Sequence, residues 1–390
     1  MKLRSRIADG LPDIVEWRRS LHADPELGFE ETRTAAFIAA KLREFGLEVH
    51  EGIGRTGVVG VLRRGNGPMV GLRAEMDALP ILEATDRAYA SKTPGVMHAC
   101  GHDGHTAMLL GAARLLAQAP PPDGAIAFIF QPAEETLGGG KAMIDEGLFR
   151  DFPVGSVFGL HNWPGVPEGR FAIHTGPVMA ANDTFELVIE GRAGHAAMPH
   201  QTVDPVSVAA QIFQAWQTIV SRNVDPADAA VISVTQIHAG DAWNVVPQFA
   251  TLRGTVRTLR AATRDMIQTR MTELSDRISS AFGAHAAMNY TRRYPTTINT
   301  KEEALLSVAV ACECSESAPM TELAPSMAAE DFSYMLQEKL GAYVWLGSGP
   351  AEGGHNLHSP HYDFNERLLP IGVEYWFRLA HRALGTSFTE

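Results

Sequence analysis

The richest concentration of reactive side chains lies in one short segment, residues 98–106, which reads His-Ala-Cys-Gly-His-Asp-Gly-His-Thr. One thiol, three imidazoles and a carboxylate fall within eight consecutive positions of it. Thiolate and neutral imidazole are the usual protein ligands for zinc and similar divalent ions. Gly101 and Gly104 allow the backbone to fold closely around an ion. Because loops rarely gather such scarce residue types, the segment predicts a metal site.

Further carboxylates and imidazoles follow four apolar runs that have the length of buried strands. These runs cover residues 69–72, 126–130, 157–160 and 342–346. The polar residues that come after them, in chain order, are Glu75, Asp77, Glu134, Glu135, His161, His355, His358, His361 and Asp363. Ligands of open α/β sheets bind beyond the carboxyl ends of the strands. The pattern therefore predicts one polar site at that edge of a sheet.

The number of candidate donors exceeds the four positions that a single tetrahedral ion offers. Two ions that share a ligand are therefore plausible. Paired ions about 3.5–4 Å apart recur in hydrolases, where they activate a water molecule and polarise a carbonyl group. A carboxylate beside the ligands can accept the proton of that water and pass it to a leaving amine.

The elements that must position these residues alternate between helical and strand-like patterns. Apolar spacing predicts a helical segment over residues 14–48 that ends at Gly46, and another helix over 106–119. Residues 57–62 and 69–72 read as strands, and the turn Arg64-Gly65-Asn66-Gly67 between them predicts a hairpin. The alternation favours an α/β sheet that is covered on both faces.

The pattern changes near residue 182 to a compact α+β unit. Its predicted helices cover residues 204–221 and 264–282, and its strands include residues 184–189. We therefore predict one large domain, residues 1–181 and 295–390, that is interrupted by an inserted domain, residues 182–294.

Composition excludes several classes of function. The chain has 390 residues and a formal charge of −12, so it lacks the basic balance of a nucleic-acid binder. Its most apolar stretches fall short of the ~20 residues that a membrane span needs. The first residues lack the apolar region of a secretory signal, and three cysteines cannot build a disulfide framework. We therefore expect a cytoplasmic protein.

Six motifs occur in the order of a known family: MHACGHDGHT, QPAEE, GLHNWP, GRAGHAAMPH, NVVP and AAEDFSYM. With them the chain resembles the amidohydrolase branch of the aminoacylase/carboxypeptidase metallopeptidases, which includes hippurate hydrolase and the hydrolases of auxin–amino acid conjugates. The resemblance extends from about His22 to Pro360. It implies a mixed-sheet α/β catalytic domain like that of the zinc peptidases, with an inserted α+β lid and dimerisation domain. It also implies a homodimer or homotetramer that forms through this inserted domain.

The resemblance also implies a role for each motif residue. Two divalent ions, of zinc, manganese, nickel or cobalt, would be held by Cys100, His102, Glu135, His161 and His358. Cys100 would bridge the ions, Glu134 would act as the general base, and Asp77 would orient a ligand imidazole. The branch usually has aspartate at position 75, where this chain has Glu75. The carboxypeptidase relatives have a metal-binding histidine there, and we expect Glu75 to lie near the ions without binding them.

The inserted domain would contribute to substrate binding. His195 would stabilise the oxyanion of the tetrahedral intermediate, in its own site or in that of a neighbouring subunit. Asn244 and Arg257 are thirteen residues apart, as are the substrate contacts of the carboxypeptidase relatives. Arg257 would bind the carboxylate of the substrate.

These expectations describe an amidohydrolase that cleaves N-acyl amino acids to a carboxylic acid and a free amino acid. The preference for N-acyl amino acids is implied by the resemblance alone. Two alternatives remain open. The same site could serve a dipeptidase or carboxypeptidase, which would also have to recognise a free amine. The chain could instead be a metal-binding or amino-acid-binding protein without catalysis, although Glu134, Asp77 and His195 are all intact.

Overall fold

The computed structural model describes residues 3–135, 137–350 and 356–386, so His355 lies outside the described residues. The chain forms two compact units. The larger unit comprises Met1–Val178, Ile298–Ala324 and Asp331–Glu390. The smaller unit comprises Met179–Thr297 and Pro325–Glu330, so a short later segment groups with it.

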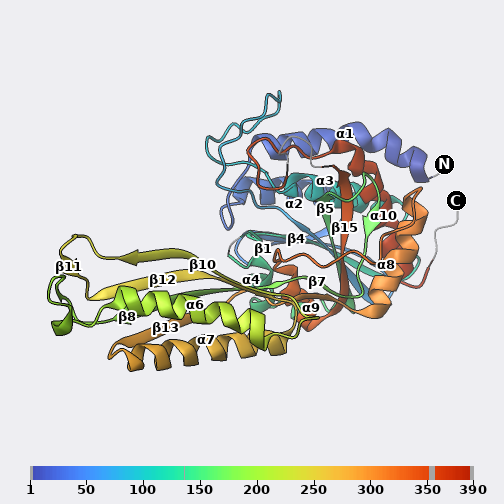
Figure 1. The fold of residues 1–390 in the computed structure, drawn as a ribbon. Helices are drawn as coiled ribbons and strands as arrows, with labels where there is room; N and C mark the ends of the chain where they lie inside the picture. Colours follow the sequence, from blue (N-terminus) through green and yellow to red (C-terminus); the bar gives the residue numbers. More distant parts are fainter. Residues whose placement is uncertain (1–2, 136, 351–355, 387–390) are drawn as a thin grey trace. The chain divides into compact units, whose positions relative to one another are not determined.

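The larger unit is built on a seven-stranded mixed sheet with the strand order β1-β2-β4-β3-β5-β15-β6. Figure 1 labels β1, β4, β5 and β15 of this sheet. The strands are β1 (Glu48–Ile53), β2 (Gly57–Arg64), β3 (Met69–Glu75), β4 (Gly124–Gln131), β5 (Ser156–Pro164), β6 (Phe171–Ala172) and β15 (Leu340–Gly349). The four central strands β4, β3, β5 and β15 are parallel. Their carboxyl ends therefore meet at one edge of the sheet.

Helices cover both faces of this sheet, as the sequence predicts. They are α1 (Leu3–Ala23), α2 (Thr32–Glu44), α3 (His102–Gln118), α4 (Gly139–Asp145), α5 (Leu148–Asp151), α8 (Lys301–Cys314), α9 (Phe332–Glu338), η3 (Glu366–Leu368) and α10 (Leu369–Ala383). Val344 and Leu346 of β15 join the core that contains α1, α3 and α10. The alternate residue Tyr343 faces Phe332 of α9, with ring centroids 5.6 Å apart. The period-2 alternation of β15 thus supplies both faces of the sheet.

Two expectations about this unit are wrong. The helical segment predicted over residues 14–48 is two helices, because α1 ends at Ala23 and a residue that precedes proline, here Asp24, is disfavoured in helical conformation. The hairpin predicted at Arg64–Gly67 does not form, because β4 lies between β2 and β3 and pairs with both.

Among the described residues, no helix combines the length and apolar character needed to cross a bilayer.

The smaller unit is a four-stranded antiparallel sheet, β10-β12-β8-β13, packed on two helices (Figure 1). Alternate residues of β8, including Phe185 and Leu187, are buried against Trp216 and its neighbours. Asp204 caps α6 by accepting the N–H of Val206 at 2.9 Å. The elements of this unit are β8 (Ala181–Glu190), β9 (Gly194–His195), η1 (Pro199–Gln201), α6 (Pro205–Asn223), β10 (Ala230–Ala239), β11 (Val245–Val246), β12 (Phe249–Thr258), α7 (Ala261–Ala281) and β13 (His285–Arg292). β7 (Gly176–Met179) and β14 (Thr297–Asn299) form a separate two-stranded sheet, and each includes a point where the chain passes from one unit to the other.

Candidate metal centre and active site

Polar side chains converge at the carboxyl edge of the central parallel strands, where the sequence places a site. Glu75 ends β3 directly beside Gln131, which ends β4. His161 lies near the end of β5, and α3 begins at His102. The residue before α3, Gly101, has φ +92°, and a Cβ there would lie 2.3 Å from the Asn162 side-chain oxygen. Only glycine can therefore bring Cys100 and His102 this close to β5.

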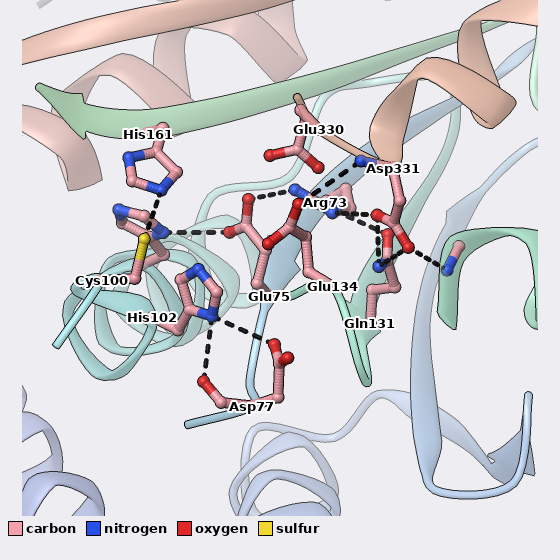
Figure 2. Close-up of polar contacts among 12 residues, drawn as sticks. Arg73, Glu75, Asp77, Cys100, His102, Gln131, Glu134, His161, Glu330 and Asp331 are labelled. Atoms are coloured by element: carbon pink, nitrogen blue, oxygen red, sulfur yellow. Dashed lines mark hydrogen bonds and ion pairs between the residues drawn. The ribbon is translucent and has the colours of Figure 1, made fainter. Parts of the chain in front are cut away.

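Three predicted ligands form one buried group, Cys100, His102 and His161, whose donor atoms lie within 4.8 Å of one another. Cys100 Sγ is 3.4 Å from His161 Nε2 (Figure 2). His161 Nδ1 lies 2.6 Å from the carbonyl oxygen of Asn162, to which it can donate its proton. This arrangement leaves Nε2 as the free donor atom of His161.

His102 is oriented by Asp77, the residue predicted for this task. His102 Nδ1 lies 2.9 Å from the backbone oxygen of Asp77 and 3.1 Å from its carboxylate (Figure 2). The opposite nitrogen, Nε2, is buried and has no hydrogen-bond partner among the described residues. A buried nitrogen without a partner is costly, whereas a cation held beside it would satisfy it. The donor set therefore fits a divalent ion.

The remaining predicted ligands form a second group with the same thiol. Cys100, Glu135 and His358 have donor atoms within 4.8 Å of one another. His358 Nε2 is 3.3 Å from Glu135 Oε1. The backbone N–H of Glu135 donates to Asp77 at 3.0 Å, so Asp77 orients a residue of each group. The structure thus brings all five predicted ligands into two groups that share Cys100.

The electrostatics of the two groups favour a cation. Burial opposes the charged imidazolium of His102, but the Asp77 carboxylate outweighs burial and raises the pKa of His102 to about 10. Burial and the nearby Glu135 raise the pKa of the Cys100 thiol well above its usual value. The His102 imidazolium and the Cys100 thiol each bind metal only after losing a proton. Metal binding here would therefore release protons and become tighter as the pH rises.

Glu134, the predicted general base, is buried beside these groups. One carboxylate oxygen accepts the backbone N–H of Asp331 at 3.4 Å. Glu134 also forms a group with His102 and Glu135 in which the donor atoms lie within 4.8 Å of one another. The chain reaches this position through Ala133, whose φ is +52° and whose N–H donates to Glu31 at 2.9 Å. A carboxylate so placed can exchange a proton with a water molecule bound between the ligands.

Glu75 is engaged by protein groups on both of its oxygens. It forms a buried ion pair with Arg73 (Figure 2). Its other oxygen lies 3.0 Å from His105 Nδ1. Burial raises the pKa of Glu75, but Arg73 and His105 outweigh burial and hold this pKa well below its usual value. Glu75 also belongs to a third group of donors, with His102 and His105. The expectation that Glu75 binds no ion stays a prediction.

Sequence reasoning missed the polar groups that support these residues. Arg73 donates to Gln131 at 2.8 Å and to Asp331 at 2.9 Å, inside the protein. His105 Nε2 lies 2.7 Å from the side-chain oxygen of Asn162. The available signal for Arg73 was its position directly after the apolar run 69–72, which has the length of a buried strand. A charged residue in such a strand must have a buried partner.

The three predicted residues of the smaller unit lie in two different sheets. His195 on β9 pairs with Val245 on β11, and Asn244 immediately precedes that strand. His195 and Asn244 are both exposed. Arg257 is half-buried on β12, between Asn182 and Val231 on the neighbouring strands. Burial lowers the pKa of Arg257. The structure therefore brings His195 and Asn244 together and places Arg257 in the adjoining four-stranded sheet.

Comparisons with known proteins agree with this fold and this site. Hippurate hydrolase of Campylobacter jejuni is 42% identical over 386 residues, which cover 98% of this chain and 100% of that protein. Thermostable carboxypeptidase 1 of Saccharolobus solfataricus is 39% identical over 401 residues and covers 100% of both chains. A solved structure from Bacillus subtilis, described as a dinuclear metal-binding peptidase of family M20, has a TM-score of 0.85 at 33% identity. It covers 97% of this chain and 99% of that one.

The family itself is settled by the extent of the match. Peptidase family M20/M25/M40 matches residues 71–382, which include every predicted site residue of both units. The resemblance that the motifs indicate, and the mixed-sheet α/β fold class, are thereby confirmed. The chain belongs to peptidase family M20/M25/M40.

Proposed function

We propose that this protein is a metal-dependent amidohydrolase that cleaves N-acyl amino acids to a carboxylic acid and a free amino acid. The observation that carries the proposal is the buried thiol of Cys100, shared by two groups of candidate ligands with Glu134 beside them. The relative at 42% identity, named hippurate hydrolase, supports the substrate class.

Two divalent ions would be held by the groups that meet at Cys100, namely Cys100, His102, Glu135, His161 and His358. Bound ions of this kind lower the pKa of water and polarise a carbonyl group. The thiolate favours zinc, while manganese, nickel or cobalt can occupy a site of mixed thiolate, imidazole and carboxylate ligands.

In this mechanism Glu134 transfers the proton, while Asp331 and Asp77 orient the side chains that take part. Glu134 takes a proton from the attacking water and returns it to the nitrogen of the leaving amino acid. The N–H of Asp331 restrains the Glu134 carboxylate. Asp77 accepts a hydrogen bond from His102 Nδ1 and so keeps the unprotonated Nε2 available to a cation.

The smaller unit, residues 182–294 in the predicted boundaries, would act as a lid and dimerisation domain. His195 would donate a hydrogen bond to the oxygen that becomes negative as the carbonyl is attacked. Asn244 would contact the substrate, and Arg257 would bind its carboxylate, for which the planar guanidinium is well suited. We further propose a homodimer or homotetramer that forms through this unit.

The catalytic domain would comprise residues 1–181 and 295–390. A cytoplasmic location suits the chain, because all three cysteines are free thiols and Cys100 must stay reduced to bind metal.

The test is amine release from protein loaded with Zn²⁺ or Mn²⁺, measured on hippurate, on N-acetyl-amino acids and on simple dipeptides. The proposal requires cleavage of the acylated substrates in preference to the dipeptides. Cleavage of dipeptides alone would favour a peptidase. The relative that is 39% identical and is named a carboxypeptidase is the reason to test this alternative. Stoichiometric metal binding without turnover on any substrate would favour a protein that binds without catalysis.

A further inference from the structure

A second set of charged and polar groups centres on the buried side chains of Arg18, His22 and Asp103, the second residue of α3. We call it the Arg18 cluster: Arg18, His22, Glu83, Tyr89, Asp103 and Asp363. Arg18 and His22 lie on α1, and both side chains are fully buried. The chemistry proposed above uses no member of this cluster.

The Arg18 guanidinium joins α1 to two segments that are distant in sequence. Its Nε lies 2.8 Å from Asp103 Oδ2, at the start of α3. Its Nη2 donates to Asp363 Oδ1 at 2.7 Å, in the segment that follows the last predicted ligand. The face of the guanidinium packs on Tyr89, whose ring centroid is 4.9 Å from Cζ, and the Tyr89 hydroxyl donates to Asp363 at 2.9 Å.

Both of these segments carry candidate metal ligands. Asp103 directly follows His102, and Asp363 lies five residues after His358. Residues 356–365 form neither helix nor strand, so no backbone ladder holds His358 in place. His358 is tied to the first segment by its N–H, which donates to the Ala99 carbonyl at 2.8 Å. Its segment is also held by Tyr362, whose hydroxyl accepts from Asn162 at 2.7 Å.

We propose that Arg18 is a positioning residue for the metal centre, which sets the separation between the Cys100–His102 segment and the His358 segment. An arginine fork binds two carboxylates in a fixed geometry, and a buried pair is little screened by solvent. This inference rests on the proposed function, because it requires that these residues bind metal. Arg18 is not among the candidate ligands. It would act through Asp103 and Asp363, and its further contact with Glu366, at 3.4 Å, holds the chain just beyond Asp363.

A matched control exists on the same pair of helices. Arg114 of α3 donates to Asp13 at 2.7 Å and to the Gly10 carbonyl at 2.9 Å, both on α1. It thus joins α1 to α3 as Arg18 does, but twelve residues beyond His102. Arg114→Met should therefore loosen the helix pair without moving the ligands.

The experiment measures Zn²⁺ affinity by chelator competition in the full-length wild type, Arg18→Lys, Arg18→Met, Asp363→Asn and Arg114→Met, with urea unfolding of each. We expect Arg18→Met and Asp363→Asn to weaken the binding of at least one ion by about 10–100-fold. Arg18→Lys should restore part of the loss, and Arg114→Met should stay within about twofold of wild type. Arg18→Met removes one of the two cationic groups beside the buried Asp103 and leaves His22, 2.9 Å away, so this variant loses stability. Asp363→Asn, at the partly exposed end of the cluster, tests the link without that loss.

The outcomes distinguish a role of Arg18 in positioning the metal ligands from a role in stabilising the fold alone. Wild-type affinity in Asp363→Asn and in Arg18→Lys would overturn the inference while leaving the proposed function intact. An equal loss of affinity in Arg114→Met at matched stability would also overturn it, since any loosening of α1 would then suffice. A wild-type chain that binds no Zn²⁺ would overturn the proposed function and this inference together.

Discussion

The candidate residues of the larger unit and those of the smaller unit differ in how they are held. Cys100, His102 and His161 are buried, and each histidine is oriented through its second nitrogen by another protein group. His195 and Asn244 are exposed. They are placed by the short pairing of β9 with β11, and His195 Nδ1 also accepts the N–H of Ala197 at 3.1 Å.

The two regions differ because buried polar side chains need partners from the protein, whereas exposed side chains can be hydrated. Taking polar groups out of water is unfavourable unless partners replace the water. The larger unit therefore surrounds its buried ligands with further polar groups, such as Asp77, while exposed residues, His358 of the larger unit and His195 of the smaller unit, depend less on such partners. Changes in the first region should alter metal binding and stability, and changes in the second should alter the reaction alone.

Removing the shared thiol should have the largest effect. Cys100→Ala is expected to lose bound metal and all measurable turnover, because both groups of candidate ligands contain this sulfur. Elemental analysis of the purified protein and an amine-release assay check this. Cys312→Ala, which removes an exposed free thiol, is the matched control and should keep both properties. Full metal content in Cys100→Ala would contradict the sharing of Cys100.

Removing the proposed base should separate chemistry from metal binding. Glu134→Gln keeps the shape of the side chain but cannot accept a proton, so kcat should fall by about 10²–10⁴-fold. Metal content should match that of the wild type, because Glu134 is not among the predicted ligands. Near-full activity in this variant would show that another group is the base.

The exposed histidine should affect the reaction without affecting the fold. His195→Ala is expected to lower kcat by about 10²–10³-fold, as does the loss of one oxyanion donor in other hydrolases. Its free energy of unfolding should stay within about 0.5 kcal/mol of wild type, because the side chain is exposed. His200→Ala, an exposed histidine of the same unit, is the control. A large loss of stability in His195→Ala would break the contrast between the two regions.

The smallest effect is a pH-dependent contribution to stability from His22. Burial opposes its charged form, but hydrogen bonds to Asp103 and Glu83 outweigh burial and raise its pKa to about 9, from 6.5 in the unfolded chain. A raised pKa stabilises the fold fully below pH 6.5, and the gain is lost as pH rises toward 9.

Urea unfolding of wild type and His22→Asn across this range measures that contribution. The difference in free energy of unfolding should shrink by up to about 3 kcal/mol between pH 6.5 and 9. His195→Asn serves as the exposed control, and its difference from wild type should stay flat. A constant difference for His22→Asn would show that His22 acts through packing alone.

The parts of the fold that the sequence predicted well are those governed by local pattern. The apolar runs at residues 126–130 and 342–346 are the parallel strands β4 and β15, and the His-rich segment begins α3. The hairpin at Arg64–Gly67 was wrong because turn residues reveal a change of direction but not the strand that pairs. β4, which begins at residue 124, takes that place between β2 and β3.

The family and the fold class were readable from the sequence, which also supplied a set of candidate site residues, because scarce residue types in a fixed order are recognised without coordinates. Only the tertiary structure revealed what holds them. Arg18 looks like one more surface arginine on an amphipathic helix, yet its partners Asp103 and Asp363 lie 85 and 345 residues away along the chain. Arg73 likewise meets Asp331 across 258 residues. Spacing along a sequence reports on helices and strands, whereas a buried charge is satisfied by whichever residues the folded chain brings beside it.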